Sequence, residues 1–196
     1  MTGPTPDRYD PPADRVVPPR PSPIDLHTHT RRSDGVLEPA ILVEAAASAG
    51  VRLLAITDHD TLAGYRDVRR AELPVGLELV AGVEINSIAE AIPDLWEGEL
   101  HVLGYGMDPD DEGFEAALAA QRGRRATRFT RTVARLRELG LPIDAQVAEL
   151  APGPDDALGR PTIARCLVRA GYASSVEDAF RRLVGRGQPA YVPRSG

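Results

Sequence analysis

Histidines and carboxylates gather near the start of the chain, where residues 24–34 read Ile-Asp-Leu-His-Thr-His-Thr-Arg-Arg-Ser-Asp. If this segment begins as a strand, His27 and His29 lie on the same face, because side chains two residues apart in a strand point the same way. Asp34 precedes Gly35, and a glycine allows a turn that brings the carboxylate back toward the two imidazoles. Imidazole and carboxylate groups together bind divalent transition metals, so the spacing indicates a metal site.

The chain has two further histidines, and both stand beside apolar runs. His59 lies in Thr-Asp-His-Asp and His101 in Glu-Leu-His-Val-Leu-Gly. Glu84 lies between them in Gly-Val-Glu-Ile, where a strand would hold a bridging carboxylate rigidly. Each of these residues alone is compatible with an ordinary place in the core or on the surface, because histidine is commonly half-buried. That interpretation has to hold for all four histidines at once, so we favour a shared metal site.

The composition is that of an ordinary globular protein, with 42% apolar residues in a chain of 196, enough for one sizeable domain with or without an inserted subdomain. A net charge of −6 argues against a protein that coats nucleic acid in general, although all 23 basic residues are arginine. The single cysteine, Cys166, excludes an internal disulfide. No stretch resembles a signal peptide or a membrane span, so we expect a cytoplasmic protein without membrane contacts, and we predict no stable protein partner.

Strands and helices are predicted to alternate after a proline-rich start. Residues 1–23 contain eight of the 18 prolines and no apolar periodicity, which is typical of a disordered leader. The patterns beyond it predict helices at 40–49 and 61–72 and strands at 52–57, 77–85 and 100–105. The unbroken apolar run at 52–57 is typical of a strand buried on both faces. His59 then lies just past the carboxyl end of that strand, where α/β proteins place their chemistry.

From residue 109 onwards the patterns predict helices only. These helices are expected at 112–120, 124–139, 161–170 and 176–184. The last of them begins after Ser175 with an acidic capping box. Residues 189–192 then look extended, and we expect them to return to the sheet.

The series of motifs resembles the polymerase and histidinol phosphatase (PHP) family of metal-dependent phosphoesterases. Within that family it is most similar to the group that removes the 3′-phosphate from nucleoside 3′,5′-bisphosphates and trims short RNA from the 5′ end. Members of that group carry a helical insertion with a Gly-Arg-Pro motif, which is present here as Gly159-Arg160-Pro161. They usually have a histidine where this chain has Thr162, which weakens the correspondence at that position. The resemblance covers residues 24 to about 193.

The resemblance implies an α/β fold, namely the N-terminal part of a distorted (β/α)7 PHP barrel with an all-helical insertion. The expected organisation is a leader at 1–23, the barrel at 24–107, the insertion at 108–188 and the start of a return to the barrel at 189–196. The later motifs of the family, a histidine before a proline and an Asp-x-His pair, are absent from the chain. We therefore expect these 196 residues to be a truncated form that is poorly stable and has little activity alone.

The resemblance further implies six ligands around two to three divalent ions. Ion by ion, they are His27, His29 and Glu84; Glu84 and His101; and Asp34 and His59. Mixed nitrogen and oxygen ligands suit manganese, zinc or iron, and we favour manganese. The implied reaction is hydrolysis of a phosphate ester by a hydroxide that bridges the ions, which Glu84 positions, so no side-chain nucleophile is required. The implied substrates are nucleoside 3′,5′-bisphosphates or the 5′ ends of short RNA.

Arginines provide candidate phosphate ligands. Arg124, Arg128, Arg131 and Arg135 recur at helical spacing and form a stripe, which is either a solvated helix face or a wall that grips a phosphate. Arg160 is the better single candidate, because it stands just ahead of a helix that begins with proline, near backbone N–H groups that favour phosphate. We predict that Arg160, Arg128 and Arg124 bind substrate.

Two other functions stay open at this point. The first is a degenerate or truncated PHP module that binds a metal or a phosphorylated ligand without turnover, which the missing motifs favour. The second is a histidinol-phosphate phosphatase, against which the helical insertion with Gly159-Arg160-Pro161 argues.

Overall fold

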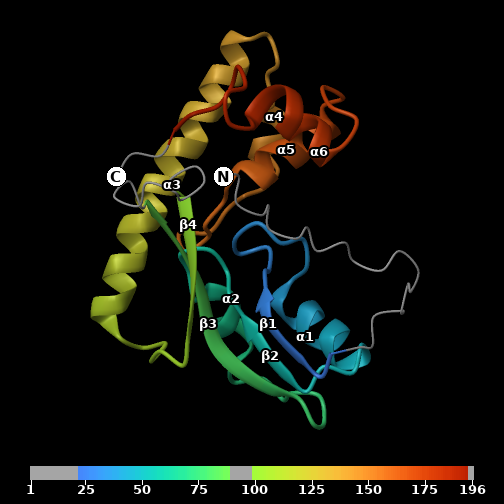
Figure 1. The fold of residues 1–196 in the computed structure, drawn as a ribbon, viewed down its shortest axis with the longest axis vertical. Coiled ribbons are helices and arrows are strands. Elements are labelled where there is room, and N and C mark those ends of the chain that lie inside the picture. The colour runs from blue at the N-terminus through green and yellow to red at the C-terminus, as the bar shows by residue number, and fades with distance from the viewer. Residues whose placement is uncertain (1–21, 89–98, 194–196) are drawn as a thin grey trace, which may run out of the picture.

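The computed structural model describes residues 22–88 and 99–193 of the chain. It consists of a sheet region, in which helices α1 and α2 pack on a curved sheet, and a helical region beside it (Figure 1). The leader expected at residues 1–23 falls almost wholly outside the described residues and stays a prediction. None of the helices in the described part of the chain is long and apolar enough to cross a membrane.

The sheet has four strands in the order β1-β2-β3-β4. These strands are β1 Ile24–Thr28, β2 Leu53–Ile56, β3 Glu78–Ile88 and β4 Glu99–Tyr105. β1 and β2 run parallel, as do β2 and β3, whereas β4 pairs with β3 in the antiparallel direction. The predicted strands are all present within a few residues of their expected bounds. The register places His101 opposite Asn86 and Leu103 opposite Glu84.

Helices α1 Pro39–Ser48 and α2 Ala63–Val68 cover one face of the sheet. α1 begins with a proline, whose fixed backbone angle suits the first turn of a helix. α2 is shorter than the helix expected at 61–72, and the Ala63 N–H donates to the Thr61 hydroxyl at its start. Leu54 and Ile56 of β2 are buried against both helices, as the unbroken apolar run indicated.

The helical region contains one long helix and several short ones. They are α3 Glu112–Glu138, α4 Asp144–Ala148, α5 Arg160–Arg169, α6 Val176–Ala179 and the π-helical turn η2 Phe180–Val184. The prediction of separate helices at 112–120 and 124–139 is wrong, because α3 continues through Gly123. A glycine inside a helix costs about 1 kcal/mol relative to alanine, which the buried contacts of Arg122 and Arg125 on either side offset. α4 was not predicted.

Residues 189–193 pack on the helices and form no strand with the sheet, contrary to the predicted return. The Ala190 N–H donates to the Leu183 carbonyl at 2.9 Å, and Ala190 is buried in the core of the helical region. The Ala190 side chain is therefore buried by packing on the helices and not on the sheet. The boundaries proposed at 24–107, 108–188 and 189–196 stay a prediction.

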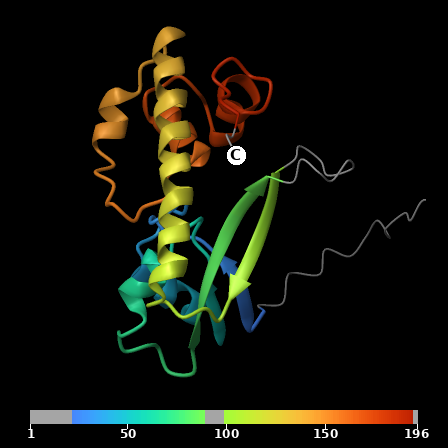
Figure 2. The same ribbon diagram turned by 90° about the vertical axis from the view of Figure 1, so that its left-hand side faces the viewer.

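α3 belongs to both regions. Figure 2 shows it running from beside the sheet at one end to the other helices at its far end. Near its start Leu118 packs on Leu62 and Val83 of the sheet region. Near its end Leu136 is buried among Ile143 and the residues of α5. α3 thus fixes the helical region over the edge of the sheet where the histidines lie.

Candidate metal centre

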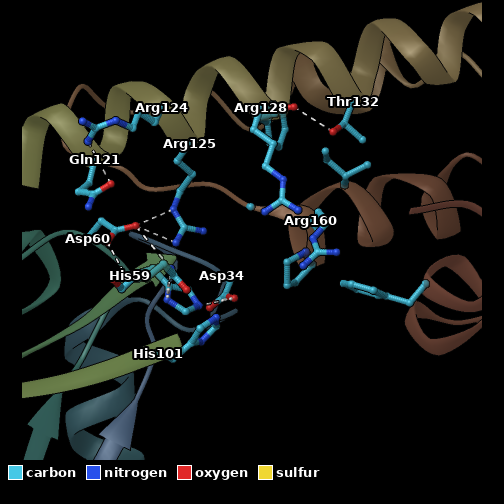
Figure 3. Close-up of a pocket in the computed structure, with 17 residues that line it drawn as sticks. Asp34, His59, Asp60, His101, Gln121, Arg124, Arg125, Arg128, Thr132 and Arg160 are labelled. Atoms are coloured by element: carbon cyan, nitrogen blue, oxygen red, sulfur yellow. Dashed lines mark hydrogen bonds and ion pairs between the residues drawn. The ribbon is translucent and has the colours of Figure 1, made fainter. Parts of the chain in front are cut away.

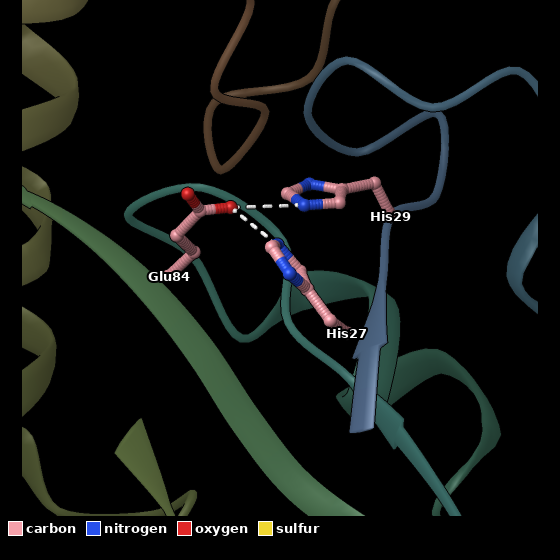
Figure 4. A group of neighbouring side chains, drawn as sticks. All are labelled: His27, His29 and Glu84. Atoms are coloured by element: carbon pink, nitrogen blue, oxygen red, sulfur yellow. Dashed lines mark hydrogen bonds and ion pairs between the residues drawn. The ribbon is translucent and has the colours of Figure 1, made fainter. Parts of the chain in front are cut away.

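β1 and the residue after it present the first two candidate ligands. His27 lies on β1, which ends at Thr28, and His29 is the next residue, so the two-residue spacing of an extended chain places both imidazoles on the same side. Glu84 on β3 faces them (Figure 4). Its Oε2 lies 3.0 Å from His27 Nε2 and 2.9 Å from His29 Nε2.

A second group lies at the loop that follows β1. His29 Nδ1 is 3.2 Å from Asp34 Oδ1, and His59 Nε2 is 3.2 Å from Asp34 Oδ2. The loop folds back because the N–H groups of Ser33 and Gly35 both donate to the Thr30 carbonyl. A side chain at Gly35 would collide with the His29 carbonyl, since a Cβ there would lie 2.2 Å from that oxygen. The glycine therefore allows the turn that the sequence indicated.

The third group joins β3 to β4. His59 Nδ1 lies 3.4 Å from Glu84 Oε2, and His101 Nδ1 contacts Glu84 Oε1. Glu84 is 3% exposed and touches all four histidines of the chain. Its carboxylate is the centre around which the other ligands are arranged.

The structure brings all six predicted ligands together in three groups that share more residues than the family pattern implies. The groups are His27, His29 and Glu84; His29, Asp34 and His59; and His59, Glu84 and His101. Within each group the ligand atoms lie within 4.8 Å of one another. His29 and His59 each belong to two groups, whereas the family pattern assigns each to one. Which residues hold which ion stays a prediction.

The charges of the cluster favour cations. Burial would raise the pKa of Glu84 and of Asp34, but hydrogen bonds from His101 and His29 and the nearby imidazole charges hold both pKa values well below their ordinary range. Burial would lower the pKa of His29, but hydrogen bonds and charge from Asp34 and Glu84 raise it from 6.5 to about 9. The two carboxylates are therefore ionised, and they attract positive charge to the space between the ligands.

The donor set fits a divalent transition metal. Imidazole nitrogens with carboxylate oxygens are ligands that manganese, iron and zinc accept. The three groups share ligands, so ions held by them would be close neighbours. The cluster can therefore hold metal.

Asp58 holds the loop between His29 and Asp34 in place through hydrogen bonds. Its Oδ1 accepts hydrogen bonds from the Thr30 N–H at 2.7 Å and the Ser33 hydroxyl at 2.6 Å, and its Oδ2 accepts from the Thr30 hydroxyl at 2.6 Å. Gly64 makes room for this carboxylate, because a Cβ there would lie 2.2 Å from Asp58 Oδ2. Asp58 thus ties the loop that carries Asp34 to the end of β2. The pattern of the sequence does not indicate this role, although Asp58 directly precedes His59.

A cavity of about 460 Å³ opens beside the ligands, between the sheet edge and the helical region. Asp34, His59 and His101 line one end of it (Figure 3). Arg124, Arg128 and Arg160, the predicted substrate residues, line it as well. Arg131 and Arg135 are not among its lining residues, so the arginine stripe of α3 faces the cavity only in part.

Aromatic rings hold two of these arginines. The Arg160 guanidinium lies 5.4 Å from the centre of the Tyr191 ring and 5.8 Å from that of Phe180. The Arg128 guanidinium lies 5.5 Å from the Tyr191 ring, and its Nε donates to the Val192 carbonyl. Such contacts restrict the side chains and so preorganise them toward an anion.

Comparison with known proteins identifies the family to which this chain belongs. The family model described as "PHP domain" matches residues 25–145, and the chain therefore belongs to the PHP domain family. Its fold agrees with this assignment: a solved structure assigned as a metal-dependent phosphoesterase from Bifidobacterium adolescentis superposes with a TM-score of 0.78 at 36% identity, covering 88% of this chain and 58% of that one. The predicted α/β half-barrel with helices is confirmed.

Two curated relatives narrow the relationship. A 5′-3′ exoribonuclease from Haemophilus influenzae is 37% identical over 86% of this chain and 58% of its own length. A 3′,5′-nucleoside bisphosphate phosphatase from Chromobacterium violaceum is 32% identical over 86% of this chain and 57% of its own length. The predicted relationship to this group is confirmed. The chain spans less than two thirds of the length of either relative.

Proposed function

We propose that this protein is a metal-dependent phosphoesterase that hydrolyses phosphate esters of nucleotides, with nucleoside 3′,5′-bisphosphates or the 5′ ends of short RNA as substrates. One observation carries the proposal. A buried carboxylate, Glu84, is surrounded by four imidazoles at the end of a cavity that arginines line. This arrangement places ligands for cations next to ligands for phosphate.

The six ligands would hold two to three divalent ions, with manganese as the favoured metal. Such ions lower the pKa of water and stabilise the charge that develops on a phosphate during in-line displacement. Glu84 and Asp34 contribute the negative charge that would hold them, and His27, His29, His59 and His101 contribute imidazole nitrogens as further ligands. The low pKa values of both carboxylates keep them ionised at neutral pH.

The arginines select the substrate in this proposal. Arg160 and Arg128 present guanidinium groups on the helical side of the cavity, and Arg124 extends that side. A guanidinium binds a phosphate through paired charge-assisted hydrogen bonds. A second phosphate or a continuing RNA backbone would reach them. The names of the relatives from Haemophilus and Chromobacterium support the same substrate class. The cytoplasmic location is part of the proposal.

The test is release of phosphate from adenosine 3′,5′-bisphosphate and of mononucleotides from a 5′-phosphorylated pentaribonucleotide, both with manganese. Glu84→Gln should abolish both activities. Arg160→Ala should raise KM by an amount equivalent to about 1.5–3 kcal/mol, the size of a charge-assisted hydrogen bond. Arg131→Ala is the matched control, because Arg131 is an exposed arginine on α3 that does not line the cavity.

Three results would count against the proposal. Manganese binding without turnover of either substrate would favour a module that only binds. Preference for histidinol phosphate over both substrates would reassign the substrate class. An equal effect of Arg160→Ala and Arg131→Ala would remove Arg160 from the substrate site.

A further inference from the structure

Asp60 has a partner for each of its polar groups. Its N–H donates to the Glu84 carbonyl at 3.0 Å, and its Oδ1 accepts from the Asn86 N–H at 3.2 Å. Its Oδ2 accepts from Nη2 of Arg125 at 2.8 Å and from Nε at 3.1 Å. Its carbonyl accepts from Nη1 of Arg122 at 3.2 Å. Asp60 is therefore fixed from the sheet on one side and from α3 on the other.

The backbone of Asp60 is in an unusual conformation. Its φ is +51°, in the left-handed region that side chains other than glycine seldom adopt. Such a conformation persists only where the surroundings hold it in place. His59, a member of two of the three ligand groups, directly precedes Asp60. Any relaxation of Asp60 would therefore move a candidate metal ligand.

The contacts that α3 makes with Asp60 are buried. Arg122 and Arg125 lie three residues apart, so both point from the same side of the helix. Their side chains are 8% and 11% exposed, and Arg122 also binds Glu115 on its own helix. Figure 3 shows Arg125 reaching from α3 to Asp60, beside His59 and Asp34. The helical region thus reaches the metal centre through a guanidinium.

The carboxylates on either side of His59 are both directed away from the ligand groups. Asp58 is engaged by Thr30 and Ser33, and Asp60 by Arg125, and neither belongs to a ligand group in the described part of the chain. Without its guanidinium partner, Asp60 would be an unpaired buried charge beside the metal centre, and it would reorganise toward solvent or a cation.

We propose that Arg125 is a positioning residue for the metal centre: by holding Asp60 it fixes the backbone that orients His59 for a divalent ion. This inference rests on the proposed function, since it requires that the cluster binds metal. Residues that orient a metal ligand from outside typically change metal affinity about 10- to 100-fold when they are removed. A purely structural ion pair would instead change the stability of the fold and leave the affinity of the folded protein unaltered.

Calorimetric titration with Mn²⁺ distinguishes the two roles. We expect Arg125→Met to bind Mn²⁺ about 10- to 100-fold more weakly than the unaltered protein. Arg125→Lys should recover part of the loss, because the ammonium keeps the charge but lacks the planar fork. Arg137→Met is the control, since Arg137 is also on α3 and also ion-paired, but with the exposed Asp144. That control should bind Mn²⁺ normally.

Asp60→Asn tests the same ion pair by changing its other member, and it is the alternative variant if Arg125→Met does not fold. Asparagine keeps the acceptor for the Asn86 N–H but loses the charge that Arg125 pairs with, so the affinity should fall as well. Mn²⁺ affinity within about twofold of the unaltered protein in whichever of the two variants folds would overturn the inference, because that change is far below the expected range. Absence of Mn²⁺ binding in the unaltered protein would reject the proposed function instead, so the two failures are distinguishable.

Discussion

The sheet region and the helical region differ in what they bury. Beside the metal centre, the sheet region buries hydroxyls and carboxylates, with Thr30, Thr57, Asp58 and Thr61 at 1% exposure or less. The helical region buries a larger set of apolar side chains that packs as a single core. Buried polar groups are stabilising only when each is hydrogen-bonded, whereas apolar packing stabilises without such conditions. The sheet region holds the ligands in place, and the helical region contributes much of the apolar packing.

The two regions meet at α3, where both kinds of contact occur. Leu118 packs on the sheet region through apolar contacts, whereas Arg125 pairs with the carboxylate of Asp60 and Arg122 donates to its backbone carbonyl. Metal affinity should therefore respond to changes near the sheet and to this pair of arginines, and hardly to changes in the core of the helical region.

The largest expected effect on stability comes from that core. Leu167 on α5 is fully buried, and Leu167→Ala should lower the free energy of unfolding by about 2–5 kcal/mol, the usual cost of such a cavity. Denaturant unfolding measures the loss. Mn²⁺ affinity at a temperature where the variant is folded should stay unchanged. If Leu167→Ala also weakened Mn²⁺ binding, the core of the helical region would contribute to metal affinity as well as to stability.

Asp58→Ala should affect both properties by a smaller amount. It removes the acceptor of two hydroxyls and one backbone N–H, so we expect a loss of about 1–3 kcal/mol in unfolding free energy. The loop that carries Asp34 should also loosen and weaken Mn²⁺ binding. Asp58→Asn keeps one acceptor oxygen and should be milder in both measurements. Unaltered Mn²⁺ affinity in Asp58→Ala would show that the loop is held by other contacts.

Metal affinity and stability should both depend on pH. A metal displaces the proton of His29, whose pKa is about 9, so Mn²⁺ affinity should rise by up to about tenfold per pH unit until about pH 9 and then level off. The stability of the protein in chelator should show the opposite trend. Because the folded pKa is raised, the contribution of His29 is fully present below pH 6.5 and is lost as pH rises through about 9.

Asp34→Asn is the control for this pH dependence. It removes one of the two carboxylates that raise the pKa of His29, so both transitions should move to lower pH. Equal pH profiles in the two proteins would show that another group titrates.

Local patterns in the sequence pointed to the candidate ligands but not to the residues that hold them in place. His27, His29 and Glu84 could be placed because strand periodicity and strand ends fix the direction of a side chain. Arg125 could not be placed, since its partner Asp60 is 65 residues away in the chain and helix periodicity does not encode such a contact. The one hint in the sequence that His59 is held by its neighbours is the aspartate on either side of it, Asp58 and Asp60.

The same limit explains the errors in the fold. Separate helices were expected at 112–120 and 124–139, but α3 continues through Gly123, because tertiary contacts override the low helix propensity of glycine. The return to the sheet at residues 189–192 was expected from an extended pattern, but Ala190 is buried among the helices instead. Both cases depend on packing partners that are distant in sequence.

The most direct test of the metal centre is a crystal structure with Mn²⁺ and an anomalous difference map recorded at the manganese edge. We expect peaks among the three ligand groups, with Glu84 next to more than one of them. The map should lose those peaks in Glu84→Gln crystals grown under the same conditions. Peaks only at other acidic surfaces, or peaks of equal height in the Glu84→Gln crystals, would contradict the assignment of this cluster as the metal centre.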